Sequence, residues 1–259
     1  MNILQRIALT KKSEVNAMER VFPKEILESM AYDIKRVPLS MTDSILDKPA
    51  GIIAEHKRRS PSRGEISPMS NVAQIALEYA ENGAAAMSVL TDTPYFGGSL
   101  TDLAVARDAV PGLPLLRKEF VIDEYQLYQS RIYGADAVLL IASLLSEKEI
   151  RLFNDLAHTL GLQTLVEIHS LDEVSMLPAD ADMVGVNNRD LTSFNTDIGN
   201  SSRLVEHLPS GIVKIAESGI KSPEDLKRLK SVGFDGFLIG EAFMSTPNPG
   251  ETLHKFLES

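Results

Sequence analysis

The chain has 259 residues but no cysteine, which excludes disulfide bonds and thiolate metal sites. Its five histidines do not fall in an HExxH-type pattern, so no zinc or other metal site is expected. No apolar run is long enough to cross a bilayer, and the amino terminus lacks the apolar core of a signal peptide. These absences predict a cytoplasmic protein without a membrane partner.

Basic residues are also in short supply, because 26 lysines and arginines face 36 aspartates and glutamates. The resulting net charge of −10 makes a general nucleic-acid surface unfavourable, so no nucleic-acid partner is expected. An anionic ligand can still bind at a local basic pocket. Hydrophobic residues make up 44% of the chain, which is enough for one large globular core.

From residue 51 onward, short apolar runs alternate with helical patterns eight times. The apolar runs predict strands at residues 51–57, 84–90, 113–120, 137–143, 163–169, 183–188, 211–218 and 236–243. The helical patterns predict helices at residues 72–82, 100–109, 124–133, 147–160, 171–177, 200–207, 223–231 and 250–257. Eight such units predict an α/β protein, a single-domain (β/α)8 TIM barrel over residues 1–259. A doubly wound open sheet is the alternative, although no G-x-G-x-x-G follows the first strand.

Residues 1–48 precede this alternation and are expected to form a helical extension packed on the barrel. Helical spacing is clearest for Ile26, Leu27, Met30, Ala31 and Ile34, after Pro23. An amphipathic helix usually covers a core, so packing is the expected role of the extension.

The carboxyl ends of the predicted strands carry an unusual number of charged side chains. Glu55 and Lys57 end the first strand and share one face, because side chains alternate along a strand. Alone, this pair would indicate a structural ion pair. Similar positions on other strands hold Lys118, Glu167, Asn187, Arg189 and Glu217. In a barrel these ends meet at one mouth, and fixed acids and bases gathered there favour proton-transfer catalysis.

Glycines follow the last two strands, where barrels of this kind commonly bind phosphate. Ser218 and Gly219 follow the seventh strand, and Gly240 follows the eighth. Glycine lets an oxyanion approach backbone N–H groups, although each glycine alone would indicate only a turn. Ser60, after the first strand, adds a hydroxyl.

Two aromatic residues, Phe96 and Phe120, lie in loops near the predicted mouth and are candidates to grip a flat substrate, with core packing as the alternative. His56 and His169 adjoin proposed catalytic positions. Strand alternation is expected to point both imidazoles outward, so neither histidine is given a role.

Several motifs occur in one order along the whole chain. They are Ile53–Lys57 with Ser60–Gly64, Ser88–Thr91, Leu116–Phe120, Leu165–His169, Asn187–Leu191, Ala216–Ile220 and Ile239–Ala242. On these motifs the chain resembles the indole-3-glycerol-phosphate synthase family of tryptophan biosynthesis. The resemblance implies a lyase that closes the indole ring of 1-(2-carboxyphenylamino)-1-deoxyribulose 5-phosphate, releasing carbon dioxide and water. It also implies that neither a metal nor an organic cofactor takes part. In this family the amino-terminal helices partly cover the barrel mouth, so the resemblance implies a role beyond packing for residues 1–48.

The same resemblance assigns roles to residues. Lys118 would be the general acid that protonates the substrate ketone, and Glu167 its acid/base partner in dehydration. Glu55 and Lys57 would hold the substrate and support proton transfer. Asn187 and Glu217 would also be catalytic residues. Together with Arg189, they would orient the substrate's carboxylate and hydroxyls. The phosphate grip would consist of Ser60, Ser218, Gly219, Gly240 and Glu241. Of these, Glu241 would contribute only backbone, since its carboxylate must turn away from the anion.

Two other functions remain open on residue pattern alone. One is another phosphate-binding barrel enzyme, such as a sugar-phosphate isomerase, which would need fewer charged residues at the mouth. The other is a barrel that binds a phosphorylated metabolite without turning it over. In each case the partner is a small phosphorylated molecule, and a monomer is the favoured oligomeric state.

Overall fold

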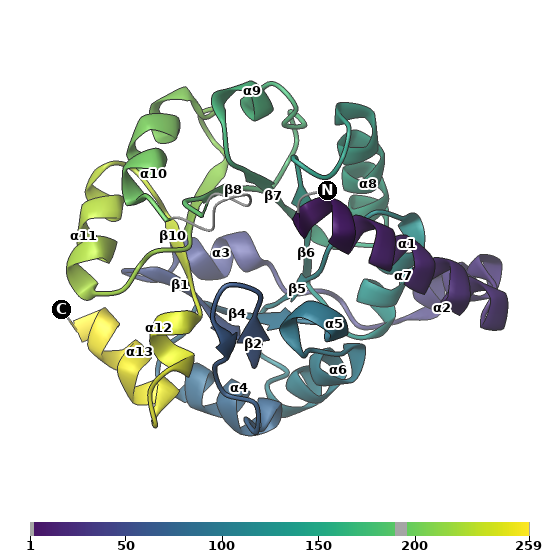
Figure 1. Ribbon diagram of the computed structural model, residues 1–259, viewed down its shortest axis with the longest axis horizontal. Helices are drawn as coiled ribbons and strands as arrows, with labels where there is room; N and C mark the ends of the chain where they lie inside the picture. The colour runs from purple at the N-terminus through teal and green to yellow at the C-terminus, as the bar shows by residue number, and fades with distance from the viewer. Residues whose placement is uncertain (1–2, 190–195, 259) are drawn as a thin grey trace.

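A computed structural model describes residues 3–189 and 196–258 of the chain (Figure 1). Eight parallel strands close into a barrel in the order β1-β10-β9-β8-β7-β6-β5-β4, which confirms the predicted fold class. The strands are β1 (Gly51–His56), β4 (Ala86–Leu90), β5 (Leu115–Lys118), β6 (Ala137–Ile141), β7 (Gln163–Ile168), β8 (Met183–Asn187), β9 (Val213–Glu217) and β10 (Gly236–Ile239).

Helices surround the barrel on its outer side, as Figure 1 shows. They are α4 (Val72–Glu81), α6 (Leu100–Ala109), α7 (Glu124–Ile132), α8 (Glu147–Thr159), α9 (Leu171–Val174), α10 (Ile198–Leu204) with the 3₁₀ turn η1 (Val205–His207), α11 (Pro223–Ser231) and α13 (Pro249–Glu258). Local sequence sets several helix starts. Ser146 accepts a hydrogen bond from the backbone N–H of Glu149, while Glu149 accepts one from that of Ser146, and Ser222 begins α11 in the same way.

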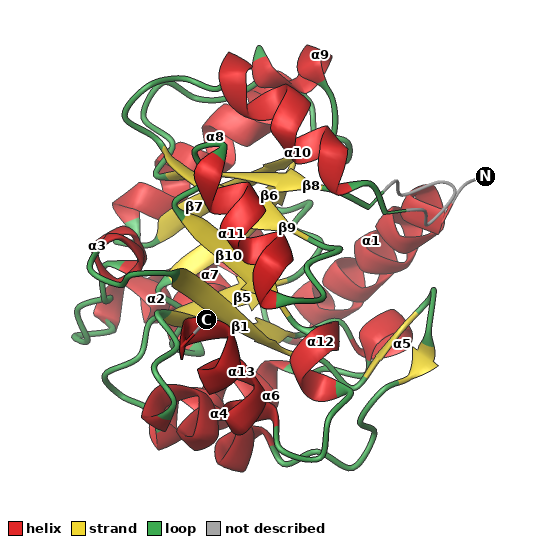
Figure 2. Cartoon of the chain, turned by 90° about the vertical axis from the view of Figure 1, so that its left-hand side faces the viewer, coloured by secondary structure: helices red, strands yellow, loops and turns green. Residues whose placement is uncertain are grey.

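The amino-terminal extension consists of α1 (Ile3–Val21), α2 (Lys24–Asp33) and α3 (Met41–Leu46). Helix α2 packs on α7, where Tyr32 and Tyr128 make an edge-on contact with centroids 6.5 Å apart. Helix α3 seals the amino-terminal end of the barrel, because Met41 and Ile45 are fully buried among interior residues such as Ile53. In contrast, α1 lies on the side of the carboxyl ends (Figure 2). The extension therefore contributes helices to both ends of the barrel.

The structure differs from the prediction in the eighth strand, which ends at Ile239 and not at residue 243. The following residues form a short helix, α12 (Glu241–Met244). Phe243 is buried between Tyr79 and Phe256, with ring centroids 6.1 and 5.2 Å away. An apolar run of this length does not distinguish strand from helix, which explains the error.

Two small elements at the mouth were not predicted. One is the hairpin of β2 (Arg59–Ser60) and β3 (Gly64–Glu65), and the other is α5 (Thr93–Phe96). Both are too short for a periodic pattern. Within residues 3–189 and 196–258, no helix is long and apolar enough to cross a membrane.

Candidate active site

Lys118, at the end of β5, points between two buried carboxyl groups. Its Nζ lies 2.5 Å from Glu217 Oε2 and 3.4 Å from Glu167 Oε2. Burial alone would lower the pKa of Lys118, but Glu217, Glu167 and Glu55 together raise it. Lys118 is therefore an ammonium group held at a fixed position at the mouth of the barrel.

Glu167 on β7 and Glu217 on β9 titrate as a pair. Burial raises the pKa of both, and the outcome differs because their neighbours differ. For Glu167, Lys118 and His169 more than offset burial, so its pKa is lowered. For Glu217, burial and the charge of Glu167 prevail over Lys118 and raise its pKa to about 8. Near neutral pH the pair therefore holds one proton, mainly on Glu217.

Gly185 on β8 makes room for this pair. A Cβ at that position would lie 2.0 Å from Glu217 Oε1, far inside van der Waals contact. Any side chain there would displace the carboxyl group from Lys118.

Glu217→Gln is expected to stabilise the fold increasingly as pH rises from about 5 to about 8. The folded-state pKa of Glu217, about 8, lies above its ordinary value of 4.5, so the folded protein keeps a proton that the unfolded chain releases. Below the ordinary pKa of 4.5, the protonated carboxyl group makes its full contribution to the free energy of unfolding. This contribution is lost as pH rises through the folded pKa, at up to about 1.4 kcal/mol per pH unit. Urea unfolding of both proteins across this range measures the difference, and parallel pH dependences would contradict the raised pKa.

Glu55 and Lys57 form an ion pair at the end of β1, with Lys57 Nζ 2.6 Å from Glu55 Oε1. Burial would raise the pKa of Glu55, but Lys57 and Lys118 lower it overall, so the carboxylate is charged. The absence of a side chain at Gly240 admits this carboxylate, because a Cβ there would lie 2.6 Å from Glu55 Oε1. The missing side chain at Gly240 thus makes room for Glu55, whereas the sequence predicted that it would admit an oxyanion to the backbone.

The rim of the mouth is tied together by arginines. Arg189 donates a hydrogen bond to Ser62 Oγ in the β2–β3 hairpin, and its guanidinium lies 3.5 Å from Glu241 Oε2. Arg63 lies 3.0 Å from the other oxygen of Glu241. Asn187 Oδ1 accepts the backbone N–H of Arg189 at 2.9 Å and so fixes the start of this loop. Asp190 and Leu191 of the same motif lie outside the described residues.

The predicted phosphate residues come from three different loops. Ser60 is buried in the hairpin, with its Oγ 3.4 Å from Ser62 Oγ. Ser218 has φ of +64°, an uncommon value for a residue other than glycine, and Gly219 continues the left-handed turn at +80°. Gly219 also lines a cavity of about 350 Å³ together with Lys221 and Arg228. Ser60, Ser218 and Gly240 do not line this cavity, so it is not a ready-made pocket for the whole set.

The two candidate aromatic residues meet beside the mouth. The ring centroids of Phe96 and Phe120 are 5.9 Å apart with an interplanar angle of 38°. Both are only partly buried, and Phe120 packs on the cluster that fills the barrel interior. Their rings therefore form a wall that a flat ligand can contact.

The prediction for His169 was wrong. Strand β7 ends at Ile168, so alternation no longer sets the direction of the next side chain, and His169 Nε2 lies 3.4 Å from Glu167 Oε1. His56 does point away, with its Nε2 2.9 Å from Ser70 Oγ.

Other features of the site were not predicted from the sequence. The Ser88 hydroxyl is buried without a hydrogen-bond partner in the described part of the chain, and Ser88 is aligned with Glu55 across the β1–β4 ladder. Period-two alternation in the second strand was the signal that could have identified it. Arg58 is paired with Asp102 through two hydrogen bonds of 2.7 and 2.8 Å, and Arg59 donates to backbone carbonyls of α5. Both arginines thus brace loops.

A closed (β/α)8 barrel with a lysine ammonium fixed between two carboxyl groups at its mouth is an arrangement typical of enzymes that use acid–base chemistry. Among the described residues, no group of three or more acidic or histidine side chains is placed to hold a metal ion. The family model for indole-3-glycerol phosphate synthase matches residues 4–256, and the chain belongs to that family.

Known proteins of this family are similar in sequence to this chain over nearly their full length. The chain is 47% identical to an indole-3-glycerol phosphate synthase from Bacteroides thetaiotaomicron, over 100% of this chain and 98% of the relative. It is 42% identical to the corresponding protein of Carboxydothermus hydrogenoformans, over 98% and 99%. Among solved structures, 3-hexulose-6-phosphate synthase from Salmonella typhimurium superposes with a TM-score of 0.64 over 80% of this chain and 97% of that one. At 15% identity, this likeness concerns the fold alone.

Proposed function

We propose that this chain is an indole-3-glycerol-phosphate synthase that converts 1-(2-carboxyphenylamino)-1-deoxyribulose 5-phosphate into indole-3-glycerol phosphate, carbon dioxide and water. Membership of the family supports the reaction. The single structural observation that carries the proposal is the Lys118 ammonium group held between Glu167 and Glu217 at the barrel mouth.

In the first step, the ring carbon that bears the carboxylate attacks the ketone carbon, and a C–C bond forms. Negative charge develops on the ketone oxygen, and Lys118 donates a proton to it. A cation fixed at a poorly solvated site does this better than water, because it needs no reorganisation as the charge develops. Loss of carbon dioxide then returns the bonding electrons to the ring and restores its aromaticity.

In the second step, Lys118, once reprotonated, donates a proton to the new hydroxyl, which leaves as water, and a proton leaves the five-membered ring. Glu167 is ionised, since its pKa is lowered, and it can accept that proton. Glu217 keeps a proton near neutral pH and limits the charge repulsion between the two carboxyl groups. Lys118 donates hydrogen bonds to both Glu167 and Glu217, so it can be reprotonated through these carboxyl groups.

The remaining side chains bind and orient the substrate. Phe96 and Phe120 pack against its aromatic ring, which suits the wall that they form. Lys57 and Arg189 face its carboxylate, and Asn187 its hydroxyls. Ser60 and the backbone N–H groups of the Ser218 and Gly240 turns take the phosphate. The Glu241 side chain is engaged by Arg63 and Arg189 and so leaves only backbone for this contact.

The direct test uses the absence of tryptophan from the chain. Excitation beyond the tyrosine band then produces indole fluorescence only from the product. Purified protein mixed with the carboxyphenylamino substrate, without added metal or cofactor, should develop this signal at a rate proportional to enzyme concentration. No signal at any tested pH or salt concentration would refute the proposed activity.

Ser218→Asp tests the phosphate site. Asp tolerates the left-handed backbone of this position, so the turn should persist while a negative charge is placed against the substrate phosphate. We expect a sharp rise in KM and loss of inhibition by inorganic phosphate.

Ser218→Asn is the matched control, since it has the same shape without the charge. Its KM should stay much closer to that of the unmodified protein. If phosphate inhibits the Asp variant as strongly as the unmodified enzyme, the anion binds elsewhere.

A further inference from the structure

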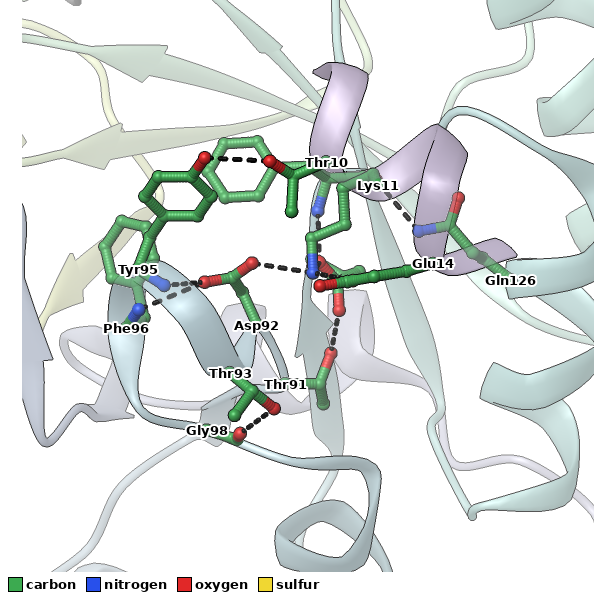
Figure 3. Close-up of polar contacts among 12 residues, drawn as sticks. Thr10, Lys11, Glu14, Thr91, Asp92, Thr93, Tyr95, Phe96, Gly98 and Gln126 are labelled. Atoms are coloured by element: carbon green, nitrogen blue, oxygen red, sulfur yellow. Dashed lines mark hydrogen bonds and ion pairs between the residues drawn. The ribbon is translucent and has the colours of Figure 1, made fainter. Parts of the chain in front are cut away.

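Helix α1 inserts a lysine beside the loops that follow β4 and β5. The Nζ of Lys11 lies 2.6 Å from Asp92 Oδ1 and 3.3 Å from Glu119 Oε1. The three side chains, here called the Lys11 cluster, are only 4%, 0% and 4% exposed. Figure 3 shows Lys11 reaching from α1 to Asp92.

A packing role alone does not call for such a cluster. Replacing buried ion pairs by apolar side chains is often neutral for stability, because desolvation offsets much of the attraction. Helix α1 already buries Leu4, Ile7 and Val15. We therefore ask which other side chains the Lys11 cluster holds in place.

The two carboxylates of the cluster each hold the backbone of one residue of the aromatic wall. Asp92 Oδ2 accepts the N–H of Phe96 at 3.0 Å, and Glu119 Oε1 accepts the N–H of Phe120 at 2.9 Å. Lys11 joins these carboxylates through its single ammonium group. The lysine thus links two loops whose rings lie 5.9 Å apart.

A second contact ties α1 to the same wall. Thr10 Oγ1 lies 2.9 Å from the hydroxyl of Tyr95, the neighbour of Phe96 (Figure 3). Tyr95 N–H also donates to Asp92 Oδ2 at 2.7 Å. Two consecutive residues of α1 therefore contact the segment that carries Phe96.

We propose that Lys11 is a positioning residue of the active site, which sets the Phe96–Phe120 wall for the substrate's aromatic ring from helix α1. This proposal rests on the proposed function for the identity of that ring. It makes α1 a part of the substrate site, a role beyond the packing expected of an amphipathic helix.

Lys11→Met should raise KM by about tenfold, the size expected when an aromatic contact is lost, and change kcat much less. Lys118 is held by Glu167 and Glu217 and not by the Lys11 cluster, so the chemical step should persist. Lys11→Arg keeps the cation and should restore most of the affinity. In a Phe96→Ala/Phe120→Ala background, Lys11→Met should have little further effect, because the wall through which it acts is gone.

Lys24→Met is the matched control. Lys24 on α2 also ties the extension to the barrel, through Glu124 of α7, but it touches neither aromatic loop. Its KM should match that of the unmodified enzyme. An equal KM effect in Lys24→Met, a loss confined to kcat, or full additivity with the aromatic substitutions would each overturn the proposal.

A measurement that does not depend on enzyme activity tests the positioning role of Lys11 independently of the proposed function. Phe120→Trp introduces a single tryptophan into the wall. Adding Lys11→Met should shift its emission to longer wavelength and increase quenching by acrylamide, whereas adding Lys24→Met should not. An unchanged spectrum would overturn the positioning role even if the enzyme is active. An inactive enzyme with the expected shift would overturn only the proposed function.

If Lys11→Met fails to fold, Lys11→Met/Asp92→Asn provides the same test. It removes one buried negative charge together with the cation, and Asn can still accept the N–H groups at the start of α5. The same rise in KM and the same spectral shift are expected, and their absence would overturn the proposal.

Discussion

Lys118→Met is expected to lower kcat by about 10²–10⁴-fold, the usual contribution of a general acid. The ammonium group lies between Glu167 and Glu217 and is the proposed proton donor to the ketone. Its interaction with the ketone oxygen develops only as that oxygen gains charge. Removing it should therefore lower kcat and kcat/KM together and leave substrate affinity nearly normal. Continuous indole fluorescence and a separate binding titration measure the two effects.

Two further variants show whether the loss of activity in Lys118→Met comes from the missing proton donor, from the missing positive charge or from a change in folding. Lys118→Arg keeps a cation between the carboxyl groups, but guanidinium gives up a proton much less readily. This variant should fold like the unmodified protein and remain nearly inactive. Lys57→Met removes the other lysine of the mouth, which is paired with Glu55. A loss of less than about tenfold in Lys118→Met, with a larger loss in Lys57→Met, would transfer the acid role to Lys57.

The convergence of these residues could be predicted because strands obey a strict period. Once the sequence showed eight strand–helix units, barrel closure required the ends of all strands to meet. Lys118, Glu167 and Glu217 then had to face one another. Their relative charge could not be predicted, because burial and the neighbouring lysine change the pKa of each carboxyl group in opposite directions.

The features that could not be predicted from the sequence lie mostly in loops and at the ends of elements. Arg58 and Arg59 make the loop after the first strand strongly basic, and the sequence does not show that Asp102 and the carbonyls of α5 engage them. His169 lies just beyond the last paired residue of β7, where alternation stops being a guide. Lys11 gave only the pattern of an amphipathic helix, since its partners Asp92 and Glu119 are distant in the chain. Each case depends on a tertiary contact that no local period encodes.

Glu167→Gln is the substitution that tests proton transfer at the second step. Gln keeps the shape and hydrogen-bonding capacity of the carboxyl group but cannot titrate. In the unmodified enzyme the pKa of Glu167 is lowered, so this group stays ionised, and able to accept a proton, to below its ordinary value of 4.5. As pH falls through that pKa, the rate should decline along an acidic limb. In Glu167→Gln we expect a large loss of kcat, nearly normal affinity and no acidic limb.

Glu217→Gln is the matched comparison, because Gln resembles the protonated form that Glu217 has near neutral pH. Below about pH 8 this variant should keep much of its activity, and the acidic limb due to Glu167 should remain. As pH rises through about 8, the unmodified enzyme gains a second negative charge beside Glu167, so any change of rate in this range should disappear in Glu217→Gln. Circular dichroism at each pH ensures that only folded protein is compared. An unaltered acidic limb in Glu167→Gln, together with an effect mainly on KM, would leave Glu167 as an electrostatic partner of Lys118 and nothing more.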